Sequence, residues 1–366
     1  MLSPKYLPLK GACPTLGDGM ITVKSSVSRL SEVAHKPLRV LMVTGIYPTE
    51  QLPHKGTFIK SQADSLVAAG VEVEILHPKP GSVLWRYFWT IAQVWLKTRT
   101  KKFDVVHGHY GQWCLFTRLQ WFVPVVATFH GSDLLGVPLS NGKSSKLHGL
   151  IASASRWLCG HVDAVMVQSE QMKRVTGRES VYVVPTGVDF ELFRPMPRAE
   201  ARAALGWDQD RYYLLFGNDP AILEKGFKLG QAALEHLRAK GVSVELVIAK
   251  SLPQTKFVQY MNACNVLFLP SISEGSPCVV KEAMACNVPV VATDVGDVAE
   301  VIRRTEGCRV CALDPDELAA GIERALQHSS PTTGRKDIAH LERSVVAERV
   351  IEVYNSVIKR YNAKGD

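Results

Sequence analysis

Short apolar runs alternate with stretches of helical spacing along most of this 366-residue chain. Between the first two runs, Ile59, Ala63 and Leu66 recur at the three- and four-residue spacing of an amphipathic helix. A chain that alternates strands and helices builds a parallel sheet with helices on both faces. The runs that predict strands cover residues 38–43, 71–75, 105–106, 123–129, 164–167, 181–184, 212–217, 244–248, 266–269 and 288–292. The pattern therefore predicts the α/β fold class, with a parallel doubly wound sheet.

A proline-rich segment divides the chain near its middle. Residues 185–197 contain three prolines and a glycine, which interrupt both helix and strand and predict a linker. The length of the chain suits two domains, each large enough to bury its own core. We expect a mobile N-terminal extension over residues 1–37, a first domain over 38–190, a second over 191–341 and a C-terminal helix over 342–366.

Residues 274–282 read Glu-Gly-Ser-Pro-Cys-Val-Val-Lys-Glu and place two acids eight residues apart around a helix start. The apolar run at 266–269 leads into this segment as a buried strand would. Ser276 is a good N-cap, and Pro277 suits the first helical position. The segment therefore predicts a helix over about 277–285.

The start of this helix has the features of a phosphate site. The backbone N–H groups of Cys278 and Val279 have no partner within the helix, and the helix dipole is positive at this end. Glu274 stands just before the start, and Glu282 lies more than one turn inside the helix. One acid can therefore hold a sugar beside the phosphate while the other reaches a ribose.

This segment and the run AMACNVPVVATDVG at residues 283–296 resemble the retaining glycosyltransferases of the large family numbered four, whose GT-B fold has two Rossmann-like domains. The resemblance covers roughly residues 39–330. It implies a hexosyl-type transferase (EC 2.4) that moves a sugar from a nucleotide-diphosphate sugar, as donor substrate, to a glycan, a lipid-linked acceptor or another hydroxyl group. It also implies that no metal ion or cofactor takes part. In this family the final helix packs back on the first domain.

The resemblance assigns roles to particular residues. Lys225 aligns with the phosphate-binding lysine of the family, while Asn218 stands where the family usually has arginine. Lys225 should then supply most of the positive charge, with help from Lys228 or Lys281. His130 corresponds to the histidine that faces the reacting sugar. The resemblance implies that Glu274 positions the sugar hydroxyls, so the expected catalytic residues are His130, Glu274 and Lys225.

Donor and acceptor residues are expected on opposite sides of a cleft. His109 and Asp133 lie at or just after strand ends of the first domain, where ligands bind parallel sheets, and we expect them on the acceptor side. A loop-packing role explains His109 equally well, and a simple turn explains Gly45 or Gly56. The expected donor-binding residues are Gly45, Gly56, Asn218, Lys225, Gly275, Ser276, Pro277, Cys278, Val279 and Glu282.

Residues 84–102 (LWRYFWTIAQVWLKTRTKK) mix aromatic and basic side chains, a composition that suits the surface of an anionic membrane. Residues 1–190 hold 21 lysines and arginines against 12 acids, a net charge of +9, whereas residues 191–366 have a net charge of −1. The expected membrane-facing residues are Trp85, Arg86, Trp89, Trp95, Lys97, Arg99, Lys101 and Lys102. The alternative is a core helix with a solvated basic end.

Several function classes lack their signatures. The sequence shows no run of about twenty apolar residues and no secretory leader, so we expect a cytoplasmic protein. If the basic first domain docks on a membrane, we expect the protein to be peripheral on its inner face. No zinc-finger, RNP or basic-zipper pattern indicates nucleic acid as a partner. The Cys308 and Cys311 pair has no second pair to complete a zinc site, so free thiols are expected.

Two alternatives to a transferase stay open at this point. One is an epimerase on the same fold, although epimerases lack the segment from Glu274 to Glu282. The other is a nucleotide-sugar-binding protein without turnover, which Asn218 in place of arginine would suit. A nicotinamide dehydrogenase is disfavoured, because no Gly-x-Gly-x-x-Gly follows the first strand. The donor base, the sugar, the acceptor and the oligomeric state stay open.

Overall fold

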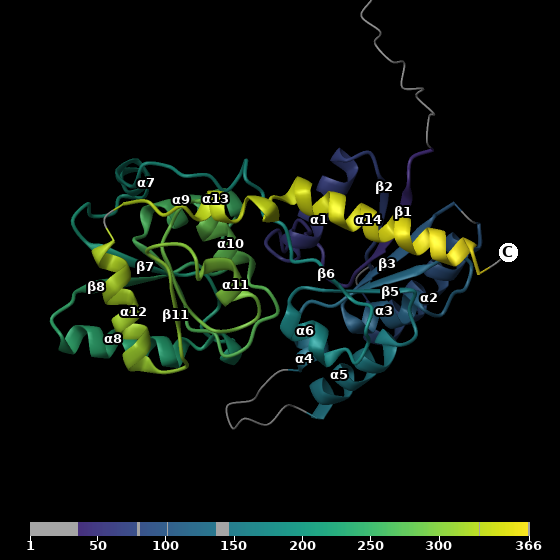
Figure 1. Cartoon of the computed structure of the whole chain (residues 1–366), viewed down its shortest axis with the longest axis horizontal. Coiled ribbons are helices and arrows are strands. Elements are labelled where there is room, and N and C mark those ends of the chain that lie inside the picture. The colour runs from purple at the N-terminus through teal and green to yellow at the C-terminus, as the bar shows by residue number, and fades with distance from the viewer. Residues whose placement is uncertain (1–35, 79–80, 101, 137–145, 329, 365–366) are drawn as a thin grey trace, which may run out of the picture. The chain divides into compact units, whose positions relative to one another are not determined.

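A computed structural model describes residues 36–78, 81–100, 102–136, 146–328 and 330–364. The chain within these ranges forms two parallel β-sheets, each covered by helices (Figure 1). The expected α/β fold class is confirmed. Nearly all of the N-terminal extension expected over residues 1–37 lies outside the described residues.

The first sheet has six parallel strands in the order β2-β1-β3-β4-β5-β6. Its strands are β1 (Arg39–Val43), β2 (Glu72–Leu76), β3 (Val105–His109), β4 (Val125–Thr128), β5 (Ala164–Val167) and β6 (Tyr182–Val183). The helices between them are α1 (Thr57–Ala68), α2 (Val83–Arg99), α3 (Gly111–Thr117), α4 (Ser132–Leu135), α5 (Lys146–Cys159) and α6 (Glu170–Val175). Central strands such as β4, with sequence VVAT, are buried along their whole length, as expected for strands covered on both faces.

The second sheet has five parallel strands in the order β11-β10-β9-β7-β8. Its strands are β7 (Tyr212–Phe216), β8 (Val244–Ile248), β9 (Val266–Leu269), β10 (Val290–Thr293) and β11 (Arg309–Cys311). The helical segments that follow β6 and connect these strands are α7 (Arg198–Leu205), η1 (Leu223–Lys225), α8 (Phe227–Ala239), α9 (Gln254–Ala263), α10 (Cys278–Ala285), α11 (Val298–Ile302) and α12 (Pro315–Gln327).

After α13 (Gly334–Asp337) and η2 (Ala339–Leu341), the chain ends in the long helix α14 (Arg343–Asn362). Its apolar face packs against α1 and the core of the first sheet, where Val350 and Tyr354 share a buried cluster with Ile59. Figure 1 shows this helix, in yellow, lying along α1 and β1. The C-terminal helix therefore completes the core of the first sheet, although it follows the second sheet in the sequence.

Strand order determines where a ligand can bind. In both sheets, successive connections run in opposite directions along the sheet, from β1 outward to β2 and back to β3, and from β7 outward to β8 and back to β9. In an open parallel sheet, ligands bind beyond the carboxyl ends of the strands at such a switch point. The loops after β1, β3, β7 and β9 are therefore the expected positions for functional side chains.

Candidate active site

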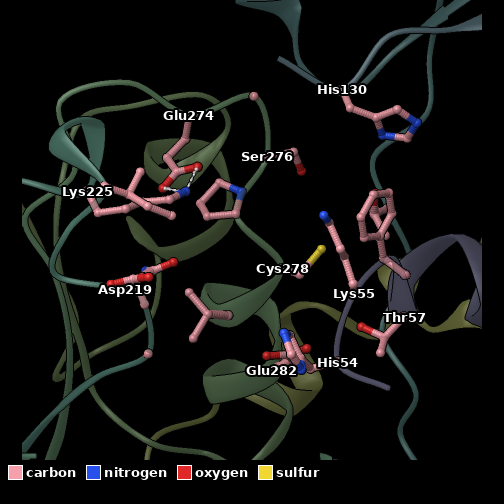
Figure 2. A pocket seen from close by; sticks show the side chains of 18 of the residues that line it. His54, Lys55, Thr57, His130, Asp219, Lys225, Glu274, Ser276, Cys278 and Glu282 are labelled. Carbon is pink, nitrogen blue, oxygen red and sulfur yellow. Dashed lines mark hydrogen bonds and ion pairs between the residues drawn. The ribbon is translucent and has the colours of Figure 1, made fainter. Parts of the chain in front are cut away.

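A pocket of about 810 Å³ lies at these strand ends and is lined by residues of both sheets. Its volume is within the usual range for a small-molecule site. The first sheet contributes residues that follow β1, β3, β4, β5 and β6, and the second contributes the loops after β7, β8 and β9. Figure 2 shows labelled side chains from four of these loops, those after β1, β4, β7 and β9. The predicted residues that line it are His130, Asn218, Lys225, Glu274, Gly275, Ser276, Pro277, Cys278, Val279 and Glu282.

The start of α10 faces this pocket. The first residues of the helix, Cys278 and Val279, line it together with Gly275, so their free backbone N–H groups are available to an anion there. Close approach requires glycine at position 275, because a Cβ there would lie 2.3 Å from the backbone oxygen of His130. The phosphate site expected from the sequence is thus exposed to the pocket.

The capping prediction at this helix is wrong in detail. Pro277, in an extended conformation, is the N-cap residue, and α10 begins one residue later, at Cys278. The hydroxyl of Ser276 donates to Asp297 (2.7 Å) and accepts a hydrogen bond from the ammonium group of Lys281. Ser276 therefore belongs to a buried polar cluster and does not cap the helix.

This cluster also removes Lys281 from the pocket. Its side chain is 1% exposed, and its ammonium group lies 3.1 Å from the carboxylate of Asp297 and 3.2 Å from the backbone oxygen of Thr186. Its charge is balanced within the protein, so the expectation that Lys281 supplies charge to a ligand is wrong. Lys228, the other lysine expected to help, is exposed and lies outside the pocket lining.

Lys225 and Glu274 form an ion pair at the edge of the pocket (Figure 2). The ammonium group of Lys225 lies 2.8 and 2.9 Å from the two carboxylate oxygens of Glu274, which also accepts from the hydroxyl of Ser271 at 2.8 Å. Gly226 holds this turn against the end of β9, since a Cβ there would lie 1.8 Å from the backbone oxygen of Pro270. The positive charge of Lys225 is therefore already partly balanced.

Sequence reasoning missed Lys55, from the loop after β1. Lys55 lines the pocket, and Figure 2 shows its ammonium group facing the start of α10 near Ser276 and Cys278. Asn218 lines the pocket too, and its amide nitrogen has no hydrogen-bond partner among the described residues. A basic residue in the loop between the first strand and the first helix was the available signal. We expect Lys55 to supply the cation that Asn218 does not.

The two glycines predicted to bind the donor have other roles. A Cβ on Gly45 would lie 2.1 Å from the ring of Trp113, and a Cβ on Gly56 would lie 2.8 Å from the backbone oxygen of Ile46. Gly56 also has a positive φ of 75° at the start of α1, which favours glycine. Neither glycine lines the pocket, although the neighbours of Gly56 do.

The predicted acceptor-side residues lie beneath the pocket. Asp133 is buried, and its carboxylate accepts from the backbone N–H groups of Gly111, His130 and Gly131, each at 3.0 Å. Burial raises the pKa of Asp133 to about 6, and these hydrogen bonds oppose the shift. His109 is fully buried as well. Both residues therefore contact the loop that carries His130, and neither lines the pocket.

Glu282 is half-buried in the pocket wall. Burial raises the pKa of its carboxyl group from 4.5 to about 7, while the charge of Lys281 opposes this shift. The unfolded chain then loses this proton near pH 4.5 and the folded chain near pH 7. Between these pH values the folded state binds more protons, so its stability decreases as pH rises.

We therefore expect Glu282→Gln to remove this pH dependence. The free energy of unfolding of the wild type should fall between pH 5 and pH 8 by about 1–2 kcal/mol relative to the variant, after allowing for the partial exposure of the side chain. Urea unfolding of both proteins at several pH values measures the difference. Parallel curves over this range would contradict a raised pKa at Glu282.

The expected membrane-facing residues, which lie on α2 and just after it, separate into two groups. Trp85 is 58% exposed, and Arg99 and Lys102 are also exposed. Trp89 packs against the core of the first sheet, and the ammonium group of Lys97 lies 2.5 Å from the carboxylate of Glu74, so neither is free for a surface. Arg86 and Trp95 are half-buried, and Lys101 lies outside the described residues. Exposed Leu84 and Phe88 add apolar surface to this helix.

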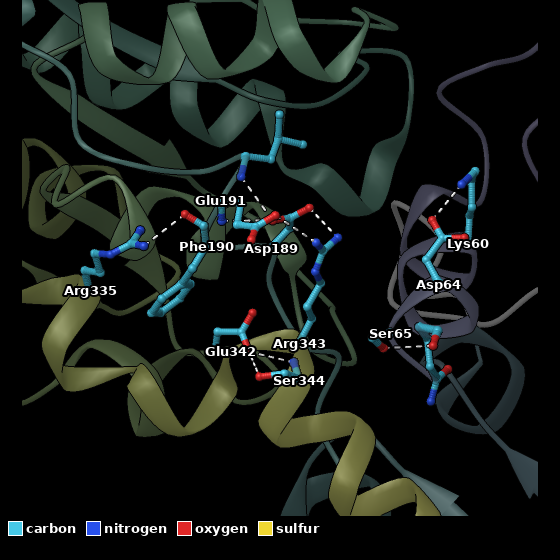
Figure 3. Close-up of polar contacts among 12 residues, drawn as sticks. Lys60, Asp64, Ser65, Asp189, Phe190, Glu191, Arg335, Glu342, Arg343 and Ser344 are labelled. Atoms are coloured by element: carbon cyan, nitrogen blue, oxygen red, sulfur yellow. Dashed lines mark hydrogen bonds and ion pairs between the residues drawn. The ribbon is translucent and has the colours of Figure 1, made fainter. Parts of the chain in front are cut away.

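The two connections between the sheets run together (Figure 3). Val188, in the linker, forms a parallel bridge with Glu342, just before α14. Arg343 forms an ion pair with Asp189, and Arg335 donates to the backbone oxygens of Phe190 and Phe193 while stacking on the Phe190 ring at 4.2 Å. These contacts tie the linker to the return segment.

Two family models match the chain. The one described as Glycosyltransferase Family 4 matches residues 55–192, and the one described as Glycosyl transferases group 1 matches residues 212–328. A protein of Bacillus subtilis (strain 168) assigned as a teichuronic acid biosynthesis glycosyltransferase is 25% identical over 353 residues, covering 78% of this chain and 89% of the relative. A D-inositol 3-phosphate glycosyltransferase of Acidothermus cellulolyticus is 28% identical over 274 residues, covering 61% of this chain and 60% of that relative. The match thus spans less than two thirds of that second relative.

Solved structures share the same fold. A sucrose-phosphate synthase from Thermosynechococcus elongatus superimposes with a TM-score of 0.71 at 18% identity, covering 88% of this chain and all of the other. The Anabaena protein HepE, in complex with UDP and glucose, superimposes with a TM-score of 0.64 at 16% identity, covering 87% of this chain and all of the other. At these identities the likeness concerns the fold alone.

Proposed function

The chain belongs to the family 4 and group 1 glycosyltransferases and has their GT-B fold, and we propose that it transfers a sugar from a nucleotide-diphosphate sugar to a hydroxyl acceptor with retention of anomeric configuration. The observation that carries the proposal is the pocket in which the start of α10, with Glu274 and Glu282 on either side, faces His130 of the other sheet.

The pocket residues suit distinct parts of such a donor. The backbone N–H groups at the start of α10, together with Lys225 and Lys55, can bind the diphosphate and stabilise the negative charge that grows on it as the sugar leaves. Glu282, deeper in α10, is placed for the ribose hydroxyls. Glu274 and His130 flank the space beside the diphosphate, where the sugar would lie. Fixed donors and cations thus take the place of a metal ion or cofactor.

A panel of nucleoside diphosphates and nucleotide sugars tests this proposal. A ligand that binds only the folded state raises the melting temperature by mass action. We expect one base to stabilise the protein, and its sugar nucleotide to release nucleoside diphosphate when an acceptor is added, with or without EDTA. If no nucleotide binds, the proposed nucleotide-sugar site is refuted. If EDTA abolishes the transferase activity, metal independence is refuted.

Asn218 favours a second candidate, a nucleotide-sugar-binding protein without turnover. The family usually has arginine at this position, and the amide nitrogen of Asn218 has no partner among the described residues. Such a protein would be stabilised by a nucleotide sugar in the same panel but would release no diphosphate with any acceptor. Turnover therefore distinguishes the two candidates. Both family models that match the chain describe glycosyltransferases, and neither describes an epimerase.

The exposed part of α2 supports a lipid-linked acceptor. No helix in the described part of the chain is both long and apolar enough to span a bilayer. The apolar side chains of Leu84, Trp85 and Phe88 are nevertheless exposed, on the half of the chain with a net charge of +9. Such a surface suits the interface of an anionic membrane. The proposal therefore places the enzyme at the inner face of a membrane, where a lipid-linked glycan can reach the cleft.

Sedimentation with liposomes checks this attachment. The wild type should pellet with vesicles of mixed anionic and zwitterionic lipid at low salt, and the double variant Trp85→Ser, Phe88→Ser should pellet several-fold less, because each exposed ring buries apolar area in the interface. Leu313→Ser is the matched control, since Leu313 is also exposed but lies next to the second sheet. A wild type that stays in the supernatant at low salt would refute the attachment.

A further inference from the structure

Three histidines lie in a row from the interior of the first sheet to the pocket. The ring centroids of His107 and His109 are 4.1 Å apart, and the rings of His109 and His130 stack at 5.3 Å with an angle of 20° between them. His107 and His109 are fully buried on β3, whereas His130 follows β4 and lines the pocket. Nδ1 of His109 lies 3.1 Å from Nε2 of His130, within hydrogen-bond distance.

All three rings are neutral near pH 7. Burial lowers the pKa of His107 and of His130 to about 3, and the pKa of His109 well below its ordinary value. A neutral imidazole has one N–H donor and one bare nitrogen that accepts. A hydrogen bond between His109 and His130 therefore determines the tautomer of both rings at once, because one nitrogen must donate and the other must accept.

The direction of this hydrogen bond follows from the second nitrogen of His109. Its Nε2 is buried and has no hydrogen-bond partner among the described residues. An unpaired buried N–H group is rarer in folded proteins than an unpaired acceptor, because its desolvation is not compensated. The proton of His109 therefore lies on Nδ1, which donates to Nε2 of His130. His130 then accepts at Nε2 and has its own proton on Nδ1.

We propose that His109 is a positioning residue that holds His130 in the Nδ1–H tautomer and thereby makes His130 a hydrogen-bond donor to the bound substrate. Nδ1 is the only ring nitrogen that His109 leaves free, and the ring lies at the edge of the pocket (Figure 2). A neutral ring with Nδ1–H facing a ligand can donate to a hydroxyl or phosphate oxygen. It has no lone pair there, so it cannot act as a base toward the acceptor. Only the identity of that ligand rests on the proposed function.

The tautomer can be measured without any ligand. We would label the histidines with ¹⁵N and identify the His130 signals by their loss in His130→Gln. At pH 7 we expect His130 to be protonated at Nδ1 in the wild type. In His109→Leu we expect a shift toward protonation at Nε2, the form that neutral imidazole side chains favour in water. A wild-type His130 protonated at Nε2, or an unchanged tautomer in His109→Leu, would overturn the proposal.

A matched set of variants tests the consequence for turnover. In His109→Asn the amide nitrogen can occupy the position of Nδ1 and donate to His130. In His109→Gln the amide lies near the position of Nε2 instead. His109→Leu has no donor at either position. We expect kcat of His109→Asn to stay within about threefold of the wild type. We expect kcat of His109→Gln and His109→Leu to be about tenfold lower, because each loses one hydrogen bond to His130. The affinity for nucleoside diphosphate should stay unchanged in all three variants. Equal kcat in the three variants would overturn the role of the hydrogen-bond donor at position 109.

The two proposals fail separately. If no nucleotide binds but His130 is protonated at Nδ1, the donor substrate is wrong and the positioning role of His109 stands. If a nucleotide sugar is turned over but His130 is protonated at Nε2, the function stands and the positioning role is wrong.

Discussion

Replacing Glu274 with glutamine should lower turnover by about a hundredfold, while the affinity for nucleoside diphosphate changes little or increases. The carboxylate of Glu274 is 11% exposed and is held by Lys225 and Ser271 next to the expected sugar position. Glutamine keeps the size and one hydrogen-bond acceptor but removes the negative charge. The ammonium group of Lys225, released from its ion pair, then interacts more strongly with the diphosphate.

Glu282 is the natural comparison for this variant. Glu282→Ala should weaken nucleoside diphosphate binding by about tenfold, the value of a hydrogen bond to a charged group, and should change kcat less than Glu274→Gln does. Steady-state kinetics and calorimetric binding on both variants separate the two effects. Equal losses in turnover with unchanged binding would contradict the division of roles between the two acids.

Replacing Lys55 with alanine should weaken nucleoside diphosphate binding by at least tenfold and leave the affinity for the nucleoside alone unchanged. Charge-assisted hydrogen bonds to phosphate are about twice as strong as neutral ones, and Asn218 offers no charge of its own. The four acidic residues that line the pocket, Asp219, Glu224, Glu274 and Glu282, make an unpaired cation important for an anionic ligand. Lys55→Arg should restore most of the affinity.

Lys60→Ala is the matched control for this prediction. Lys60 is an exposed lysine on α1 whose ammonium group lies 2.6 Å from the carboxylate of Asp64, outside the pocket lining. Calorimetric titration with diphosphate and nucleoside, at two salt concentrations, distinguishes the roles. Equal weakening of both ligands in Lys55→Ala would mean that Lys55 only supports the shape of the loop.

Lys225→Ala should weaken diphosphate binding more than Lys55→Ala does. Removing Lys225 also leaves the carboxylate of Glu274 without its cation, so an uncompensated negative charge faces the diphosphate. The double variant Lys225→Ala, Glu274→Gln should therefore bind diphosphate more tightly than the single Lys225 variant. A double-mutant cycle that shows no coupling would contradict the ion pair as described.

The strands could be predicted because their signals are local. The runs at 164–167, 244–248 and 266–269 coincide with β5, β8 and β9, since short β-branched runs between helical segments have few alternative structures. The helix at 277–285 was predicted to within one residue. The N-cap residue of this helix was not predicted correctly, because the hydroxyl of Ser276 forms hydrogen bonds with Asp297 and Lys281. No local sequence pattern indicates that a residue as distant as Asp297 competes for this hydroxyl.

Charges and glycines were the least predictable features. Lys281 was expected to help supply positive charge to the ligand but is buried, because Asp297 and the backbone of Thr186 converge on its ammonium group from distant parts of the chain. Gly45 looked like a phosphate-loop glycine, yet the ring of Trp113 occupies the space of its missing side chain. In each case the deciding contact comes from another loop at the same sheet edge.

The two parallel sheets, the helix start expected to bind an anion and the pair of acids around it could be predicted from the sequence alone, because periodicity and helix termini depend on residues within a few positions of one another. The tertiary contacts decide which charges remain free in the pocket and which nitrogen of His130 lies against His109. Those properties depend on partners such as Asp297 for Lys281 and His109 for His130, and close packing alone brings these groups within hydrogen-bond distance.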